Sequence, residues 1–421
     1  MPHMNCLSIH ASDQRKDLCF QKLSSISSPK SYTSSSFPTL HASSSSAFSS
    51  IADCESEQLP LSAQFVSCES LIPGLPDDLA FFCLLRLPLA SQAVGRAVCK
   101  AWHTVLSSWD FYQARRGLGF TEQWLFVLAF HKSTGKIQWQ ALDPAIPSWH
   151  VISPMPCTGR VCPPGFGCAA IADEGALFVC GGMRSDMDCP MDSVLKYEMY
   201  RNKWTVVESM STPRSFFASG MIDGRIYAAG GNSNESFELS SAEVYDPTED
   251  HWYAIANMGT KMARYDAAVF DGKLYVTEGW SWPFLYSPRG QIYDPKVDRW
   301  EDMTVGMREG WTGLSVVLDG LLFIISDLED NVKLKVYEAD SDSWKSVAGA
   351  PMPAQMSRPF SVNTMHGKLF VVARSLHVAM GTISNPSPEQ RERIISVDWQ
   401  VINAPERFSD FAPSNSQVLH A

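Results

Sequence analysis

The chain has 421 residues, of which 45% are hydrophobic, and a formal net charge of −11. That length is enough for one large domain and a smaller one. The acidic balance argues against nucleic acid as the main partner, because a phosphate backbone requires clustered cations. No apolar run approaches the ~20 residues needed to cross a bilayer, so we expect no membrane partner.

Residues 1–70 differ in composition from the rest of the chain. Serine occupies 20 of these 70 positions, with runs such as Ser43 to Ser46. A segment this polar cannot bury enough apolar surface to offset its chain entropy, so we predict a disordered, Ser-rich N-terminus. The serine-rich composition and the small number of acidic residues before residue 50 also fit an organelle transit peptide. Plastid targeting is therefore an open alternative, which Asp13 and Asp17 weaken.

The cysteines indicate the compartment. All eleven lie before residue 190, whereas a disulfide framework would extend through the whole fold. They therefore indicate reduced thiols in an intracellular protein, cytoplasmic, nuclear or both. Cys157, Cys162 and Cys168 raise the question of zinc, but spacings of five and six residues lack the paired Cys-x-x-Cys geometry of structural sites. We expect buried small side chains here, and neither a metal nor another cofactor.

Three short helices are predicted between residues 71 and 115. Pro76 followed by two aspartates is typical of a helix start, because its missing donor is spare in the first turn and the acids face the positive end of the helix dipole. Pro88 forces a break, Ser91 can cap a second helix, and a third covers residues 98–106. Helices this short cannot form a stable core alone, so apolar surface should remain for a partner.

The pattern of this segment resembles an F-box over residues 71–112. It combines Leu75-Pro76 with a distant Val98-Cys99-Lys100-x-Trp102. Gly95, inside the second helix, departs from the usual strong helix formers, at a cost of about 1 kcal/mol. In that family the motif docks on a Skp-type adaptor, and the resemblance implies an apolar contact made by Leu75, Pro76, Leu79, Leu84, Leu87 and Pro88. An ordinary helical subdomain packed on its neighbour is the alternative.

Five repeats follow, each marked by an apolar residue, usually Tyr, seven positions before a Trp. The pairs are Leu142 and Trp149, Tyr197 and Trp204, Tyr245 and Trp252, Tyr293 and Trp300, and Tyr337 and Trp344. Between successive tryptophans lie 55, 48, 48 and 44 residues, a period that fits one four-stranded propeller blade. Large aromatic side chains at fixed spacing are predicted to fill the wedge between blades.

Glycine-containing turns recur at fixed places in these repeats. Asp223-Gly224, Asp271-Gly272 and Asp319-Gly320 lie between two apolar runs, where a tight hairpin turn requires positive φ, and His366-Gly367 takes the same place in the last repeat. Glycine pairs such as Gly230-Gly231 close the second strand. Double glycine, Tyr and Trp together resemble the kelch motif, from about Trp124 to Ile402.

The first repeat has candidates for its second, third and fourth strands but none for its first. The C-terminus reads Ser416-Gln417-Val418-Leu419-His420, an alternating pattern that is unusual for a frayed tail. We therefore predict that residues 416–420 add the missing strand and close a ring within residues 120–421. The predicted fold is mainly β, a six-bladed kelch β-propeller preceded by a small three-helix F-box.

Two sets of residues are candidates for contact with a target protein. Arginines recur before the first strand of most repeats, at Arg214, Arg264, Arg308 and Arg358. A ring of them could grip an acidic or phosphorylated peptide through charge-assisted bonds, or each could cap loop carbonyls and pair with a neighbouring acid. Trp280 and Trp282 crowd one loop, where they could anchor an interface or fold over the blade edge.

An F-box followed by kelch repeats resembles the large plant family of F-box/kelch-repeat proteins. That resemblance implies a non-catalytic substrate receptor of an SCF-type E3 ubiquitin ligase, joined through a Skp-type adaptor to cullin and RING subunits. The protein target is not evident from the sequence. One alternative is a kelch-propeller scaffold that acts without ubiquitin ligation. Another is a copper oxidase with kelch-like blades, but that needs a Tyr/His metal cluster, and the ten histidines are scattered.

Overall fold

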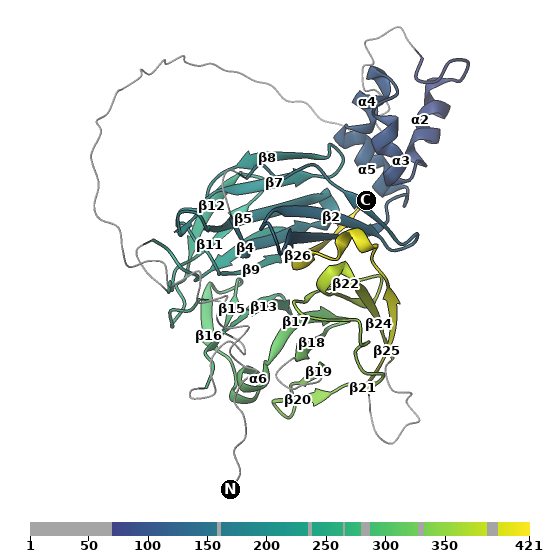
Figure 1. Ribbon diagram of the computed structural model, residues 1–421. Helices are drawn as coiled ribbons and strands as arrows, with labels where there is room; N and C mark the ends of the chain where they lie inside the picture. Colours follow the sequence, from purple (N-terminus) through teal and green to yellow (C-terminus); the bar gives the residue numbers. More distant parts are fainter. Residues whose placement is uncertain are drawn as a thin grey trace, which may run out of the picture. The chain divides into compact units, whose positions relative to one another are not determined.

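The computed structural model describes residues 70–421 except for the segments 158–160, 235–237, 264–265, 279–286, 327–331 and 385–394. The segment predicted to be disordered, residues 1–70, lies outside the described residues apart from Ser70. Within the described part, no helix combines the length and the hydropathy that a membrane crossing requires. The described residues form short helices followed by β-sheets (Figure 1).

Before the first strand, the described residues form four helices rather than the predicted three. They are α2 (Asp77–Leu85), α3 (Leu89–Gly95), α4 (Lys100–Leu106) and α5 (Trp109–Gly117), which we call the helical module. Helix α2 starts after Pro76 as predicted, but α3 starts directly after Pro88, so Ser91 lies in its first turn and does not cap it. The fourth helix arises because the Ser108 hydroxyl accepts a hydrogen bond from the Phe111 amide (3.2 Å) and caps α5.

The helical module has its own small core, made of Leu71, Ala80, Leu84, Leu85, Val105, Leu106 and Phe111. The buried Arg115 guanidinium of α5 donates to the carbonyl oxygens of Leu85 and Leu87, both at 2.6 Å, and ties the end of α2 to α5. Gly95 is also explained, because a Cβ there would lie 2.7 Å from the buried Leu106 side chain. The glycine therefore allows α3 to approach α4 closely.

Six sheets form the blades of a β-propeller. From the inner to the outer strand, blade 1 contains β26 (Phe411–His420), β1 (Gln123–His131), β2 (Ile137–Asp143) and β3 (Ser148–Val151), and blade 2 contains β4 (Val161–Ile171), β5 (Ala176–Arg184), β7 (Val194–Glu198) and β8 (Lys203–Val207). In the same order, blade 3 contains β9 (Ala218–Ile222), β10 (Arg225–Ala229), β11 (Ala242–Asp246) and β12 (His251–Ile255), and blade 4 contains β13 (Asp266–Phe270), β14 (Lys273–Thr277), β15 (Gly290–Asp294) and β16 (Arg299–Asp302). Blade 5 contains β17 (Gly313–Leu318), β18 (Leu321–Ser326), β19 (Lys333–Glu338) and β20 (Ser343–Ser346), and blade 6 contains β22 (Ser361–Met365), β23 (Lys368–Val372), β24 (Val378–Ser384) and β25 (Ser396–Ile402).

Shorter elements decorate the blades. β6 (Cys189–Pro190) pairs with β5, and β21 (Ala348–Gly349) adds a parallel strand to the outer edge of blade 6. The others are α6 (Val305–Gly310) between blades 4 and 5, and the 3-10 turns η1 (Ala172–Glu174), η3 (Arg374–Leu376) and η4 (Glu406–Phe408).

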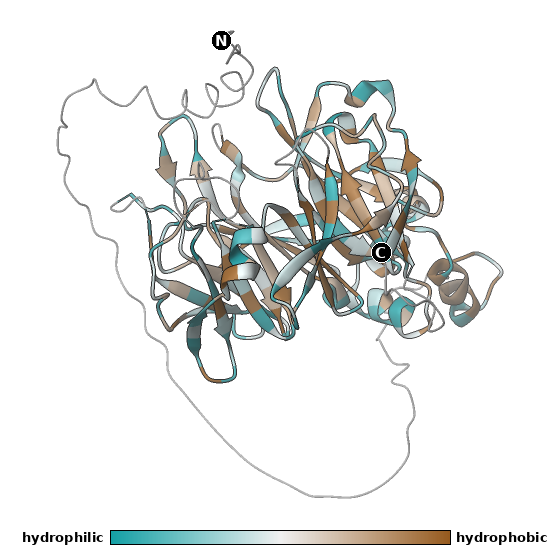
Figure 2. Ribbon diagram, turned by 90° about the horizontal axis from the view of Figure 1, so that it is seen from below, coloured by the Kyte–Doolittle hydropathy of each residue, from teal (hydrophilic) through white to brown (hydrophobic). Residues whose placement is uncertain are grey.

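The inner strands contact one another in cyclic order, β4, β9, β13, β17, β22, β26 and β4 again. A buried hydrophobic cluster fills each of the six junctions between neighbouring blades. Figure 2 shows hydrophobic residues along the strands and hydrophilic ones in many of the turns. This arrangement confirms the predicted six-bladed propeller.

The Tyr and Trp of four repeats are cross-strand neighbours on the two outer strands, as with Tyr245 and Trp252, whose rings lie 5.2 Å apart, and Leu142 faces Trp149 in the first repeat. All five indoles belong to clusters between neighbouring sheets, either at their core or packed against it. The predicted wedge role of these aromatic residues is therefore confirmed. The Asp-Gly turns also adopt the expected geometry, since Asp223 and Gly224 both have positive φ, 49° and 76°.

A hydrogen-bonded clamp accompanies the tryptophan at four junctions. At the junction of blades 2 and 3, the Asp250 carboxylate accepts from the Tyr245 hydroxyl (2.7 Å) and from the Glu208 amide of the preceding blade (3.0 Å). The Trp252 indole donates to the Glu208 carbonyl (3.0 Å). The same pattern recurs as Tyr197, Asn202 and Trp204 with Ser153; Tyr293, Asp298 and Trp300 with Ala256; and Tyr337, Asp342 and Trp344 with Met307.

The first strand of blade 1 comes from the C-terminus. β26 pairs antiparallel with β1 along its whole length, from Gln123 opposite His420 to His131 opposite Phe411. One irregularity interrupts the register between Leu128 and Ala129. The strand is therefore longer than the predicted residues 416–420, and its N-terminal half brings Phe411 into the cluster between blades 6 and 1.

The antiparallel strand order gives the propeller two different ends. The turn face carries the tight turns between the first and second strands, such as Asp223-Gly224 and η1, and the end of β26 at His420. The loop face carries the longer connections between the second and third strands, such as the one that leaves β10 at Gly230, and the segments that lead into each blade, such as residues 208–217.

Candidate protein-interaction sites

The helical module exposes several large hydrophobic side chains. Leu79 and Phe82 of α2 are 53% and 45% exposed, and Val94 and Val98 in and after α3 are 70% and 59% exposed. Leu79 and Phe82 lie three residues apart on one face of α2. A module this small that leaves four such side chains in solvent offers an apolar surface for a partner. We call these four residues the module patch.

Only part of the predicted adaptor set lies at this surface. Leu79 belongs to the module patch, Pro76 and Pro88 are exposed, and Leu75 and Leu87 are half-buried against the module core. Leu84 does not lie at this surface: it is 1% exposed, because it lies on the inward face of α2 with Ala80, one turn away. Sequence reasoning missed Phe82, Val94 and Val98. The helical spacing of Phe82 from Leu79 was the available signal.

The helical module is fastened to the turn face. The Tyr112 hydroxyl donates to the His420 carbonyl at the end of β26 (2.8 Å), and Arg96 donates to the Tyr200 carbonyl of blade 2 (2.7 Å). Arg116 pairs with Asp173 of η1 at 2.6 Å. Figure 1 shows α3 and α5 beside the C-terminal end of the chain. These contacts fix the orientation of the module patch relative to the propeller.

Aromatic packing completes this attachment. The Tyr112 and Tyr200 rings stack with centroids 5.8 Å apart, and Trp109 lies 5.6 Å from Tyr200. Gly175, which follows η1 with φ +57°, makes room for the approach, because a Cβ there would lie 2.8 Å from the Tyr112 ring. Burial raises the pKa of Tyr112, so its hydroxyl stays protonated and keeps its donor role.

Arg214, on the loop face, does not serve as predicted. Its side chain is 1% exposed, and its guanidinium pairs with Glu243 at 2.8 Å and donates to the carbonyls of Gly230 (2.9 Å) and Ser241 (2.8 Å). Its charge and donors are thus used inside blade 3. The alternative interpretation, an arginine that caps loop carbonyls and pairs with an acid, is correct at this position.

The other residues predicted to contact a target form no ring with Arg214 in the part of the chain that the structure describes. Arg308 is half-buried in α6, a helix that has no counterpart around Arg214, and Arg358 is exposed just before blade 6. Arg264, Trp280 and Trp282 lie outside the described residues. A role in target binding remains a prediction for Arg308, Arg358 and these three residues.

An ion-pair network that sequence reasoning missed joins two loop-face connections. The Arg289 guanidinium of blade 4 pairs with Glu238 of blade 3 at 3.0 Å and donates to the Lys261 carbonyl at 2.6 Å. It also bonds Glu278, through Nε at 2.7 Å. The Glu278 hydrogen bond, more than any other contact, raises the pKa of Arg289. This network holds the loop-face connections of blades 3 and 4 together.

Of the three cysteines considered as zinc ligands, Cys168 is a buried side chain that packs between two blades. Cys168 is 5% exposed within the cluster between blades 1 and 2, and burial raises its pKa. A thiol held protonated in an apolar junction is a poor metal ligand. Among the described residues, no group of three or more His, Cys, Asp or Glu side chains could hold a metal ion.

Comparison with known proteins agrees with this architecture. A family model for the FKB95 Kelch-repeats domain matches residues 136–395. The F-box/kelch-repeat protein At1g30090 of Arabidopsis thaliana is 51% identical over 354 residues, which cover 84% of this chain and 87% of that protein. The F-box protein AFR of the same plant is 37% identical, with 84% and 93% covered. A helical module docked on a kelch propeller, and relatives of this length and identity, make the chain a member of the F-box/kelch-repeat family.

Proposed function

We infer that the chain is the substrate-recognition subunit of an SCF-type E3 ubiquitin ligase. The observation that carries this proposal is the module patch of Leu79, Phe82, Val94 and Val98, held in a fixed orientation on the turn face of the propeller. A hydrophobic cluster exposed on four short helices fits the adaptor-binding role that the F-box resemblance implies. The names of the relatives support a receptor of this type.

The chain would then perform no bond chemistry. Its helical module would dock on a Skp-type adaptor and, through it, on cullin and RING subunits, while the propeller holds the target. Catalysis would belong to the ubiquitin-loaded enzyme, and the contribution of this chain would be the raised effective concentration of target lysines. Fixed contacts, such as the hydrogen bond from Arg96 to Tyr200, would limit how much the distance between the adaptor-binding site and the target-binding site can vary.

The loop face is the side we assign to the target. The helical module contacts η1, Tyr200 and His420, all on the turn face, so a protein bound at the opposite end would not meet the module. The loop face also carries the longest connections, where sequence can vary without disturbing the strands. Arg308 and Arg358 are the described cations there that remain candidates for an acidic target segment.

Co-purification with a Skp-type adaptor tests the proposal. The double variant Leu79→Ala with Phe82→Ala should weaken adaptor binding at least about tenfold, because buried apolar anchors dominate interface energy. Leu75→Ala with Pro76→Ala tests the other part of the motif. The control is Val206→Ala with Val297→Ala, which removes apolar side chains of the propeller that are even more exposed than Leu79 and Phe82, at 71% and 66%.

The same experiment separates the ligase receptor from a scaffold. Adaptor binding that survives both motif variants, or a wild-type chain that binds no Skp-type adaptor, would refute the receptor role and favour a propeller scaffold that works without ubiquitin ligation. Proximity labelling under proteasome inhibition, with the wild-type chain and the Leu79/Phe82 variant, would then identify the target. A target whose labelling persists while its ubiquitination is lost is the outcome that the receptor role requires.

A further inference from the structure

Arg308 is a half-buried arginine whose guanidinium has no partner. It lies on α6, in the segment of the loop face that leads into blade 5. Within the described part of the chain, the guanidinium forms no hydrogen bond, ion pair or cation–π contact. Its Nε atom is enclosed by the protein, whereas Nη1 and Nη2 are not. The group therefore has one desolvated edge without an acceptor and one edge that a ligand can reach.

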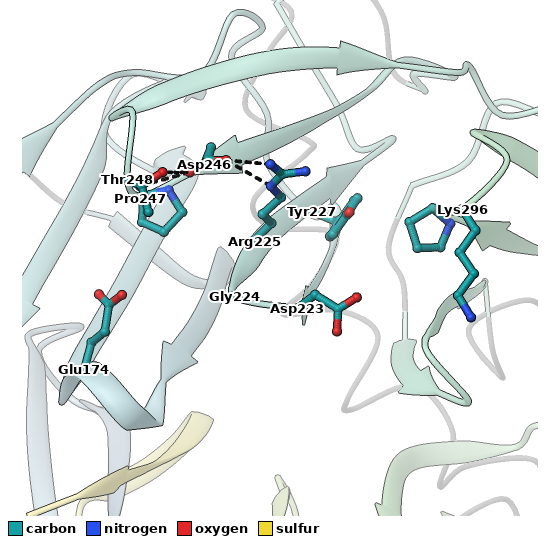
Figure 3. Close-up of a pocket in the computed structure, with 10 residues that line it drawn as sticks. Glu174, Asp223, Gly224, Arg225, Tyr227, Asp246, Pro247, Thr248 and Lys296 are labelled. Carbon is teal, nitrogen blue, oxygen red and sulfur yellow. Dashed lines mark hydrogen bonds and ion pairs between the residues drawn. The ribbon is translucent and has the colours of Figure 1, made fainter. Parts of the chain in front are cut away.

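Other arginines of the propeller show what such a group normally contacts. Arg214 and Arg289 on the loop face each donate to a carboxylate and to a backbone carbonyl. On the turn face, Arg225 pairs with Asp246 at 2.8 Å in a polar pocket of about 470 Å³, as Figure 3 shows. In these cases the protein supplies the anion. For Arg308, the described residues supply none.

The described acids near Arg308 have other partners. Arg308 packs beside Gly290 of blade 4, since a Cβ added at that glycine would lie 3.5 Å from the Arg308 Cβ. Arg289, the residue before this glycine, bonds both glutamates of its own network. Glu309, which follows Arg308 in α6, accepts from the Ser287 hydroxyl at 2.9 Å. An external anion is therefore the acceptor that fits the unpaired guanidinium.

The environment of the guanidinium favours anion binding over fold stability. A buried N–H without an acceptor destabilises the folded state, and more so when it belongs to a cation. The same enclosure strengthens the attraction of an anion at the open edge, because charges interact more strongly where water is partly excluded. The planar fork of an arginine also matches the two oxygens of a carboxylate or a phosphate.

We propose that Arg308 binds an anionic side chain of the target protein, through a carboxylate or a phosphate. The proposal rests on the proposed function, which places the target on the loop face. Arg308, rather than the fully exposed Arg358, is the anchor, because a partly desolvated guanidinium gains more from an anion than a solvated one. The target should therefore carry an acidic or phosphorylated residue in the segment that meets α6.

The test uses the full chain and blocked pentapeptides. The probes are acetyl-Gly-Gly-Asp-Gly-Gly-amide, the same peptide with phosphoserine, and the neutral peptide with asparagine. Binding is followed by the NMR signal of the Gly310 amide at the end of α6, with the Gly224 amide on the turn face as a reference. At least one anionic peptide should shift the Gly310 signal and bind roughly tenfold more tightly than the asparagine peptide. The tighter of the two identifies carboxylate or phosphate as the preferred group.

Matched variants assign the effect to Arg308. Arg308→Met should remove the preference for anionic peptides and leave the melting temperature unchanged or raised, because the fold loses no hydrogen bond and the enclosed edge becomes apolar. The control is Arg374→Met, which removes an exposed arginine of η3 on the same face and should keep the preference.

Three results would overturn the proposal. They are an asparagine peptide that binds as tightly as both anionic peptides, a preference that survives Arg308→Met, and a melting temperature several degrees lower in that variant, which would mean that the guanidinium serves the fold. Adaptor co-purification should be unchanged by both variants. A failure of the anion site is thereby distinguished from a failure of the ligase role, which appears as lost adaptor binding in the wild-type chain.

Discussion

The junction of blades 2 and 3 and the junction of blades 6 and 1 are both filled by a tryptophan, but only the first is held by hydrogen bonds to it. Trp252 donates to Glu208, and Asp250 gathers the Tyr245 hydroxyl and the Glu208 amide. At the closing junction Leu142 replaces the tyrosine, and the Trp149 indole nitrogen is buried without a partner in the described part of the chain. Apolar contact, such as Trp149 with Phe408 at 5.7 Å, fills that junction.

This difference follows from the order of the chain. At a clamped junction the two blades are consecutive in sequence, so one short connection carries the carbonyl and amide that the next repeat holds. At the closing junction the blades come from opposite ends of the propeller sequence, and β26 compensates by pairing with the whole of β1. Local hydrogen bonds to a tryptophan stabilise four of the five junctions between consecutive blades, whereas ring closure depends on one non-local strand pairing.

Removing the end of the closing strand should have the largest effect. Deletion of residues 416–421 takes away the partners of Gln123 to Val127 and the fully buried Leu419, and should lower the melting temperature by several degrees, roughly 5 to 15 °C. Calorimetry of the purified chain measures this. A synthetic peptide of residues 411–421 should restore part of the loss. An unchanged melting temperature would mean that the ring does not need this strand.

Breaking one clamp should cost less. Asp250→Ala leaves the Tyr245 hydroxyl and the Glu208 amide without their acceptor, and places alanine at φ +48°, so unfolding free energy should fall by about 1–3 kcal/mol. Urea denaturation gives the value. Asp250→Asn is the matched control, because Asn202 performs the same role between blades 1 and 2, and it should retain most of the stability. Equal losses in both variants would contradict the clamp.

The repeat that the sequence displays is the part of the fold that could be predicted. Tyr, Trp and Asp-Gly recur because most blades need the same wedge and turn, so five blades could be read from the tryptophans between Trp149 and Trp344, and the sixth from the turn at His366-Gly367. The role of Asp250 escaped notice because an acid in a polar turn is common, and only the structure shows it reaching Glu208 of the preceding blade. A sequence period shows which residues the repeats have in common, but it does not show which residues of a neighbouring blade they contact.

The candidate sites were harder to predict because exposure depends on packing direction. Leu79 and Leu84 look alike in sequence, yet one faces solvent and the other the module core, since the module docks through α5 and packs α2 inward. In the sequence, Arg214 resembles a cation that could bind a target. In the structure, its guanidinium is paired with Glu243 and donates to two carbonyl groups.

A pair of matched indole substitutions sharpens the comparison of junctions. Trp252→Phe and Trp149→Phe remove similar volumes from buried positions, 3% and 8% exposed, but only Trp252 loses a hydrogen bond and leaves the Glu208 carbonyl without its donor. Trp252→Phe should therefore be more destabilising by about 1 kcal/mol. Parallel urea titrations of the two variants provide the difference. If Trp149→Phe proved the more costly, the closing junction would rely on its indole more than its contacts indicate.

Lowering the pH should reduce the stability that a clamp with an aspartate contributes, but not the stability from a clamp with an asparagine. This is the smallest of the four expected effects. The Glu208 amide, and then the Tyr245 hydroxyl, lower the pKa of Asp250 from its ordinary value of 3.8. A depressed carboxyl pKa contributes stability that is present above the ordinary value and is lost as pH falls through the folded value. The wild-type chain should therefore lose more stability than Asp250→Asn between about pH 5 and pH 3, as followed by urea midpoints, with the difference kept small by the solvent exposure of this carboxyl. Identical pH profiles for the two chains would show that the Asp250 charge contributes nothing to the clamp, leaving only its geometry, which asparagine shares.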